Sequence, residues 1–392
     1  MLTSLALIFL FGLLLGRVFE LFKLPSLLGM IIAGIILSPH AFNLLDPSIL
    51  DISADLRQIA LIIILTRAGL SLNVTDLKRV GRPAFLMCFL PACFEIAMVI
   101  LVAPKLLGLT ILESAIMGSV IAAVSPAVIV PRMIRLIKEG YGRKNSIPQL
   151  VMAGASVDDV FVIVLFTVFT SLAVGGKITA LDFLQIPVSI ILGIIVGIIS
   201  GLFITKIFKM FKFRDTYKVI IILSLSFLLL QFEKSVENII AISALLSIMT
   251  IGITISKQDS NLTERLSAKY NKLWAGAEII LFVLVGATVD LTYVVQAGIP
   301  AILIILAALS ARMLGVYASL LKSQITHKER LFTMIAYTPK ATVQAAIGAI
   351  PLSMGLVSGQ SILTVAILSI LITAPFGAIG IDLLHKRLLE VE

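Results

Sequence analysis

The chain has 392 residues, of which 59% are hydrophobic and only 14% charged, and its mean hydropathy is +1.12. This composition excludes an ordinary water-soluble domain and indicates a polytopic membrane protein. The net charge of +9 does not indicate nucleic-acid binding, because lysine and arginine gather in alternate loops between apolar segments.

The predicted fold is all-α, with about 13 transmembrane helices. Most of the apolar segments are long enough to cross a bilayer, and the eighth is short. In chain order they lie near residues 1–22, 24–38, 53–72, 83–106, 111–134, 147–173, 184–209, 217–232, 238–256, 272–290, 298–321, 329–351 and 358–384.

The distribution of basic residues predicts the orientation in the cell membrane. Loops after odd-numbered segments, together with the tail, hold 24 of the 31 lysines and arginines. By the positive-inside rule the N-terminus is outside and the C-terminus is cytoplasmic, which agrees with an odd number of spans. The first segment has no basic residue before its apolar run and no clear cleavage site, so we expect a retained helix. We expect residues 1–392 to form one transmembrane unit without a soluble domain.

Two opposite charges lie about midway along apolar segments. Glu95 is in the fourth segment and Arg312 in the eleventh. Because an unpaired charge at that depth is costly, we expect the two to form a structural ion pair. The alternative is that either residue faces a water cavity alone. Arginine does not deprotonate in proteins, so Arg312 would not carry transported protons.

Prolines interrupt the fifth and twelfth segments, in Val124–Pro131 and Tyr337–Gln344. Pro126 and Pro339 each remove a helix hydrogen bond, which predicts two broken helices that cross at mid-membrane and offer free carbonyl groups to an ion. A harmless kink is the alternative. We expect Lys340 to neutralise the carbonyl dipoles at the helix ends, unless it extends to the cytoplasmic surface.

The sixth segment carries two adjacent acids, Asp158 and Asp159, which are the most informative feature of the chain. At ~1.5 Å of rise per residue they lie ~16 Å from Pro148, near the middle of a ~30 Å hydrocarbon core. Acids at that depth typically mark ion or proton pathways. A role in capping a helix start does not fit this position.

The two halves of the chain resemble one another at an offset of 217 residues, which carries Glu95 onto Arg312 and Arg67–Asn73 onto Leu284–Asp290. The halves begin seven helices apart, an odd number, so they run in opposite directions through the membrane. We predict an inverted repeat of residues 24–173 and 238–384. The expected ion-binding core lies within 53–173 and 272–384, excluding the helices on the dimer side.

Four motifs in order resemble those of the monovalent cation/proton antiporter superfamily, in its NHA-type sodium/hydrogen antiporter branch. They are Val124–Pro131, Ala153–Val160, Ser310–Val316 and Pro339–Gly348. The resemblance covers nearly the whole chain. It implies a thirteen-helix fold with a dimerisation domain and a moving core domain, elevator-like alternating access and a homodimer.

The resemblance also implies roles for individual residues. Asp159 matches the essential cation and proton site and Asp158 its partner. Ser125 and Thr338 lie at the crossing breaks and complete the expected set of cation-binding residues. Many relatives have Thr-Asp-Pro where this chain has Val124-Ser125-Pro126. The site therefore has one carboxylate fewer than theirs.

The residues alone also favour exchange of a cation for a proton. Burial favours the protonated form of a carboxyl group and a bound cation favours the ionised form, so the two ligands exclude one another. A bare carboxylate crosses a low-dielectric region only at high cost, so the carrier should cross when loaded. The residues thus predict exchange of a monovalent cation for H⁺, with no cofactor and no phosphate-binding loop for ATP. Together with the family resemblance, the expected function is secondary active exchange of Na⁺ or Li⁺ for H⁺.

Several alternatives remain open at this stage. One-for-one exchange is favoured over exchange of two protons, because adjacent helix residues point ~100° apart and Asp158 and Asp159 would not have equal access. A sodium-coupled solute symporter of the bile-acid type and a K⁺/H⁺ antiporter are the alternative transporters. An intramembrane aspartyl protease would need acids on different helices, so we do not expect an enzyme.

Overall fold

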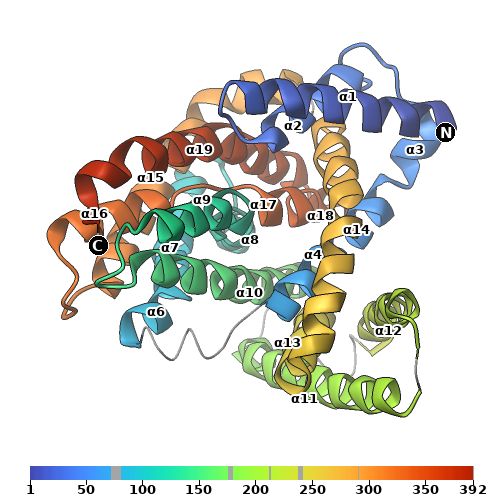
Figure 1. The fold of residues 1–392 in the computed structure, drawn as a ribbon. Helices are drawn as coiled ribbons and strands as arrows, with labels where there is room; N and C mark the ends of the chain where they lie inside the picture. Colours follow the sequence, from blue (N-terminus) through green and yellow to red (C-terminus); the bar gives the residue numbers. More distant parts are fainter. Residues whose placement is uncertain (72–80, 175–179, 212, 237–241, 290, 392) are drawn as a thin grey trace. The chain divides into compact units, whose positions relative to one another are not determined.

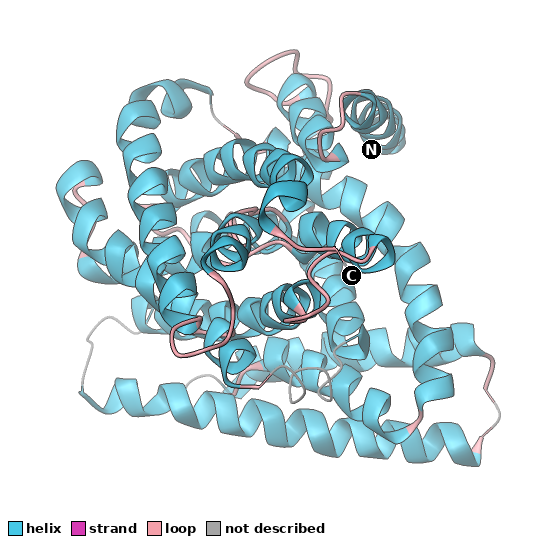
Figure 2. Ribbon diagram, turned by 60° about the vertical axis from the view of Figure 1, so that its left-hand side comes forward, coloured by secondary structure: helices cyan, strands magenta, loops and turns pink. Residues whose placement is uncertain are grey.

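The computed structural model describes residues 1–71, 81–174, 180–211, 213–236, 242–289 and 291–391 (Figure 1). Figure 2 shows that the described residues form helices and loops, as the sequence predicts. An isolated antiparallel bridge joins Tyr141 to Val391. Asn73 and Asp290, which end the two matching repeat motifs, lie outside the described residues.

The helices follow the apolar segments closely. They are α1 (Leu2–Leu21), α2 (Ser26–Leu37), α3 (Pro47–Asp51), α4 (Ser53–Ser71), α6 (Arg82–Met87), α7 (Leu90–Leu107), α8 (Ile111–Ala122), α9 (Pro126–Glu139), α10 (Ile147–Val174), α11 (Ala180–Met210), α12 (Asp215–Val236), α13 (Ala244–Gln258), α14 (Ser260–Ala287), α15 (Leu291–Ser319), α16 (His327–Ala336), α17 (Thr342–Ile347), α18 (Ile350–Ser353) and α19 (Gly359–Leu388).

The lengths and compositions of these helices confirm a multi-pass membrane protein. Within the described part of the chain, nine helices are long and apolar enough to cross a membrane. Shorter apolar helices cover Ser26–Leu37, Ala244–Gln258 and Thr342–Ser353. The total of thirteen spans stays a prediction.

Several helices are longer than the sequence suggests, and α12 and α14 are two examples. The eighth segment, expected to be short, is α12 with 22 residues. The tenth begins at Ser260 rather than near 272, because Asp259 Oδ1 accepts a hydrogen bond from Leu262 N at 2.9 Å and caps a polar first part of the helix. Hydropathy alone does not detect that part, since its residues are charged and polar.

The chain divides into two compact units. The first contains residues 1–54, 73–162 and 279–392, and the second contains residues 55–72 and 163–278. In the second unit, α11 packs against α13, where Ser247 Oγ donates to Gly193 O at 2.9 Å. All the residues that the sequence singles out as site residues belong to the first unit.

In the first unit, α7 packs along α8 and α15. Gly315 allows the close approach of α15 to α7, because a Cβ atom at this position would lie 2.7 Å from the Cα atom of Pro91. The contact lies about one turn from Arg312 on α15 and from Glu95 on α7. It therefore brings the two charged residues together.

The end of the chain contacts the loop between α9 and α10. Gly142 N donates to Glu390 O at 2.8 Å, next to the bridge between Tyr141 and Val391. His385, which the sequence suggests lies in a tail, is instead buried in the last turn of α19, with its ring 4.9 Å from that of Tyr141. The tail is shorter than hydropathy suggests, because the helix continues through basic residues.

Candidate functional site

The fifth predicted segment is interrupted at the expected proline. Helix α8 ends at Ala122, Ala123 and Ser125 have extended backbone conformations, and α9 begins at Pro126. Proline has no N–H group and disfavours a helical conformation in the residue before it, so the chain leaves the helix here. The carbonyl groups at the end of α8 consequently have no partners within their own helix.

The twelfth predicted segment is interrupted in the same way. Helix α16 ends at Ala336 and α17 begins at Thr342, with Pro339 in the non-helical stretch between them. The two breaks meet, because Ser125 N donates to Pro339 O at 2.8 Å. The expected pair of broken crossing helices is thus confirmed.

Four charged side chains form a buried network beside the breaks, three from helices α7, α10 and α15 and one from the stretch between α16 and α17. Arg312 donates from Nη1 to Glu95 Oε2 at 2.9 Å and from Nη2 to Asp158 Oδ2 at 2.8 Å. Lys340 Nζ lies 2.6 Å from Glu95 Oε1. All four are at most 1% exposed. When ionised, these two acids and two bases have no net charge, which is what permits their burial.

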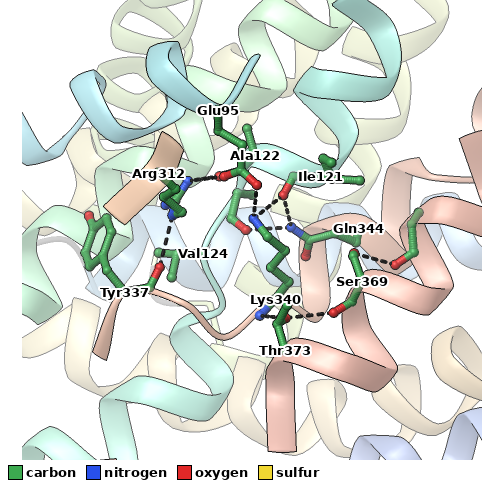
Figure 3. A network of polar contacts seen from close by, with 12 residues as sticks. Glu95, Ile121, Ala122, Val124, Arg312, Tyr337, Lys340, Gln344, Ser369 and Thr373 are labelled. Carbon is green, nitrogen blue, oxygen red and sulfur yellow. Dashed lines mark hydrogen bonds and ion pairs between the residues drawn. The ribbon is translucent and has the colours of Figure 1, made fainter. Parts of the chain in front are cut away.

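The same cations also satisfy the free end of α8 (Figure 3). Lys340 Nζ donates to Ile121 O, and Arg312 Nη1 donates to Ala122 O. These contacts oppose the negative end of the helix dipole. Lys340 therefore lies where it can neutralise the carbonyl dipoles, and it does not extend to the surface.

Two uncharged residues support this arrangement. Gln344 Nε2 donates to Ala123 O, and its Oε1 accepts from Ala341 N at 2.9 Å. Thr373 Oγ1 on α19 accepts from Lys340 N at 3.0 Å. Sequence reasoning assigned no role to either residue. Gln344 lies within a recognised motif, but an uncharged residue gives no signal from membrane depth alone.

The two adjacent acids have different environments. Asp158 Oδ2 accepts from Arg312 and from Val124 N, the latter at 3.0 Å. Asp159 Oδ1, Asp158 Oδ1 and Ser125 Oγ are buried, and none has a hydrogen-bond partner among the described residues. Buried oxygen atoms without partners are costly unless a ligand or water satisfies them.

Thr338 differs from its counterpart Ser125. Its Oγ1 donates to Ile335 O at 2.8 Å, within the last turn of α16. The described contacts do not join it to either aspartate. Ser125 is adjacent to Val124, which contacts Asp158 directly. Of the two predicted hydroxyl groups, that of Ser125 has the stronger structural support.

The charges together define what the site can hold. The network of Glu95, Asp158, Arg312 and Lys340 is neutral by itself, and Asp159 adds a carboxylate beside it. A single added positive charge, either a proton or a monovalent cation, restores neutrality. The unpartnered oxygens of Asp159, Asp158 and Ser125 are hard donors that suit such a cation.

Comparisons with known proteins show which family the chain resembles. The family model described as "Sodium/hydrogen exchanger, transmembrane" matches residues 5–386. The chain is 34% identical over 391 residues to sodium/hydrogen exchanger 9B2 of Homo sapiens, covering 94% of this chain and 70% of that protein. It is 30% identical over 403 residues to sodium/hydrogen exchanger 9B1 of Homo sapiens, covering 95% and 75%.

A solved structure has the same fold. The sodium proton antiporter MjNhaP1 from Methanocaldococcus jannaschii at pH 8 superposes with a TM-score of 0.86 and 20% sequence identity. The alignment covers 98% of this chain and 97% of that chain.

Proposed function

Because this chain belongs to the sodium/hydrogen exchanger family, we propose that it exchanges Na⁺ for H⁺ through competition at Asp159. The observation that carries the proposal is the buried, unpartnered Oδ1 of Asp159 beside a network that is already neutral. The proton and the cation each neutralise the same carboxylate. Neither can bind while the other is present, and a bare carboxylate crosses a low-dielectric region only at high cost, so together the two conditions give obligatory exchange.

The ligands of the cation would be oxygen atoms from the first break and from α10. The Asp159 carboxylate supplies the charge, and Ser125 Oγ and Asp158 Oδ1 are the nearby buried oxygens without partners. A site with oxygen donors and one free negative charge suits a hard monovalent cation, and membership of the sodium/hydrogen exchanger family favours Na⁺. Thr338 would support the second break rather than the ion.

We propose one-for-one exchange because Asp158 is already neutralised. Its Oδ2 is 2.8 Å from Arg312 Nη2, and arginine keeps its proton. Protonating Asp158 would break this ion pair and leave a net positive charge on the buried network. Asp159 is then the single acid that alternates between proton and cation, and each cycle moves no net charge.

The principal test replaces the exchanging acid. Asp159→Asn keeps the volume of the side chain and removes its charge, so Na⁺-dependent dissipation of a pH gradient in proteoliposomes should disappear while the protein stays folded. Asp382→Asn is the matched control, because Asp382 pairs with Arg132 and Arg135 outside the network. Substantial exchange by the Asp159 variant would overturn the assignment. Adding Na⁺, Li⁺, K⁺ and choline in turn measures selectivity and distinguishes K⁺/H⁺ exchange.

The stoichiometry has a separate test. The null point is the ratio of inside to outside Na⁺ concentration at which net flux vanishes. It is measured at a fixed pH difference, with the membrane potential set by valinomycin and K⁺. One net charge per cycle would change that ratio about fiftyfold for each 100 mV. One-for-one exchange predicts no change. A potential-dependent null point would exclude it.

The arrangement in the membrane forms the last part of the proposal. We expect the protein in the cell membrane with an external N-terminus and a cytoplasmic C-terminus, because basic residues gather in alternate loops. We also propose a homodimer that works by alternating access, with the repeats and core ranges expected from the sequence. Impermeant thiol labelling of single cysteines tests the orientation, and light scattering of the purified protein tests the dimer.

A further inference from the structure

Thr373 on α19 binds the backbone of the second break with its side chain. The residue is buried, and its Oγ1 donates to Ser369 O, one turn earlier, at 2.7 Å. The same oxygen accepts from Lys340 N at 3.0 Å. Figure 3 shows Thr373 with both partners. The single hydrogen of the hydroxyl group is thus used within α19, and the oxygen is left to hold the break.

The peptide group that Thr373 binds also holds the first break. This group joins Pro339 to Lys340, and its carbonyl oxygen accepts from Ser125 N at 2.8 Å. A trans peptide group is planar, and its N–H and C=O bonds point in opposite directions, so fixing the N–H also fixes the direction of the carbonyl. A chain of hydrogen bonds therefore runs from the Thr373 hydroxyl through one rigid group to the backbone of Ser125.

The first break contains an equivalent peptide group, between Ala123 and Val124. Its N–H donates to Asp158 Oδ2 on α10, which lies 34 residues later in the chain. The N–H bound by Thr373 lies 33 residues before it. The carbonyl of the first group accepts from Gln344 Nε2, a side chain from the other half of the chain. In both halves, the helix that follows the break fixes one peptide group of that break.

We propose that Thr373 is a positioning residue for the transported cation, because it holds Ser125 in place through the Pro339 carbonyl. The inference rests on the proposed function, in which Ser125 Oγ is a ligand of the cation, and deepens it. That oxygen is buried and has no hydrogen-bond partner among the described residues, so its position depends on its own backbone. Without the Thr373 hydroxyl, the Lys340 N–H is unpaired in the interior, and the peptide group turns toward another acceptor.

The first experiment replaces Thr373 by valine, which keeps the shape of the side chain and removes the hydroxyl group. In proteoliposomes the KM for Na⁺ should rise about fivefold, as expected for the loss of one ordinary hydrogen bond, while kcat changes by less than about twofold. Thr373→Ser keeps the acceptor and should stay near wild type. Thr333→Val is the matched control, because the buried Thr333 hydroxyl donates to Glu329 O within α16. An unchanged KM in Thr373→Val, or an equal rise in Thr333→Val, would overturn the proposal.

The second experiment tests whether the effect passes through Ser125. Ser125→Ala removes the hydroxyl ligand and should itself raise the KM for Na⁺. Adding Thr373→Val should then raise the KM by less than about twofold, because the group that Thr373 positions is already absent. A double variant whose KM rises by the product of the two single increases would show that Thr373 acts by another route. An unchanged KM in Ser125→Ala would contradict the role of that hydroxyl and, with it, this inference.

The third experiment measures binding without transport and does not require Thr373→Val to fold. A Cβ atom at Gly377 on α19 would lie 2.7 Å from Pro339 Cδ, so Gly377→Ala should push the same peptide group away from Thr373. The melting temperature of the purified protein is followed as NaCl is increased, with choline chloride as the control for ionic strength. Because Na⁺ stabilises the state that binds it, the concentration for half of the effect should rise about fivefold in Gly377→Ala. Wild-type Na⁺ dependence in that variant would refute the positioning role.

The two proposals fail in different ways. Substantial exchange by Asp159→Asn would overturn the shared carboxylate and leave Thr373 without a site to position. Loss of exchange in that variant, together with a wild-type response to Na⁺ in Thr373→Val and Gly377→Ala, would leave the proposed function intact and overturn the role of Thr373.

Discussion

Removing the charge of Glu95 tests whether the buried network is energetically coupled. In Glu95→Gln, Arg312 keeps Asp158 at 2.8 Å, but Lys340 loses its carboxylate partner at 2.6 Å. An uncompensated buried charge costs about 3 to 5 kcal/mol, so we expect the free energy of unfolding to fall by that amount. Lys340→Met alone leaves the network with one excess negative charge and should also destabilise.

The double variant restores the balance of charge. In Glu95→Gln with Lys340→Met, only Arg312 and Asp158 remain charged, and they still neutralise each other. We expect a loss smaller than the sum of the single losses by about 2 kcal/mol. Denaturant titration in detergent micelles measures the four free energies. Glu95→Gln combined with Asp382→Asn is the control, because Asp382 has other partners, and its effects should add. Additive losses for Glu95 and Lys340 would refute the coupling.

Two further predictions concern pH and packing. Activity should be bell-shaped in pH, because protons displace the cation from Asp159 at low pH and no proton returns at high pH; the acid limb should move to lower pH as Na⁺ rises. An acid limb that stays fixed over a hundredfold range of Na⁺, or that vanishes in His327→Ala, would point to a separate sensor. Gly315→Ala should destabilise by about 1 to 3 kcal/mol, because the new methyl group meets the backbone of α7. Gly298→Ala on the same helix has open space around it and should be neutral or slightly stabilising.

Most of the correct predictions from the sequence came from the depth of charged residues in the membrane and from the internal repeat. An arginine and a glutamate in the middle of equivalent helices each needed a partner, and the repeat joined them; Arg312 and Glu95 are in contact in the structure. The breaks at Pro126 and Pro339 followed from the missing amide hydrogen of proline. Each of these predictions starts from a charge or a proline in a single segment, and the repeat adds which segments are equivalent.

Features that depend on several helices were not predictable in the same way. The different environments of Asp158 and Asp159 arise from where Arg312 and Val124 lie, and adjacent identical residues give no sign of it. Lys340 was expected at the helix ends, but its contact with Glu95 has no counterpart in the repeat.

The order in which the network is synthesised has a consequence for biogenesis. Glu95 is made 217 residues before Arg312, and Asp158 is made 154 residues before it. At about 5 to 20 residues per second, the Glu95 helix waits on the order of 10 to 40 s for its basic partner. During that wait a lone carboxylate in the bilayer costs several kcal/mol, which a retained proton or contact with water relieves. The ion-paired site therefore forms late, and nascent chains that end before α15 should depend on the insertion machinery to stay in the membrane.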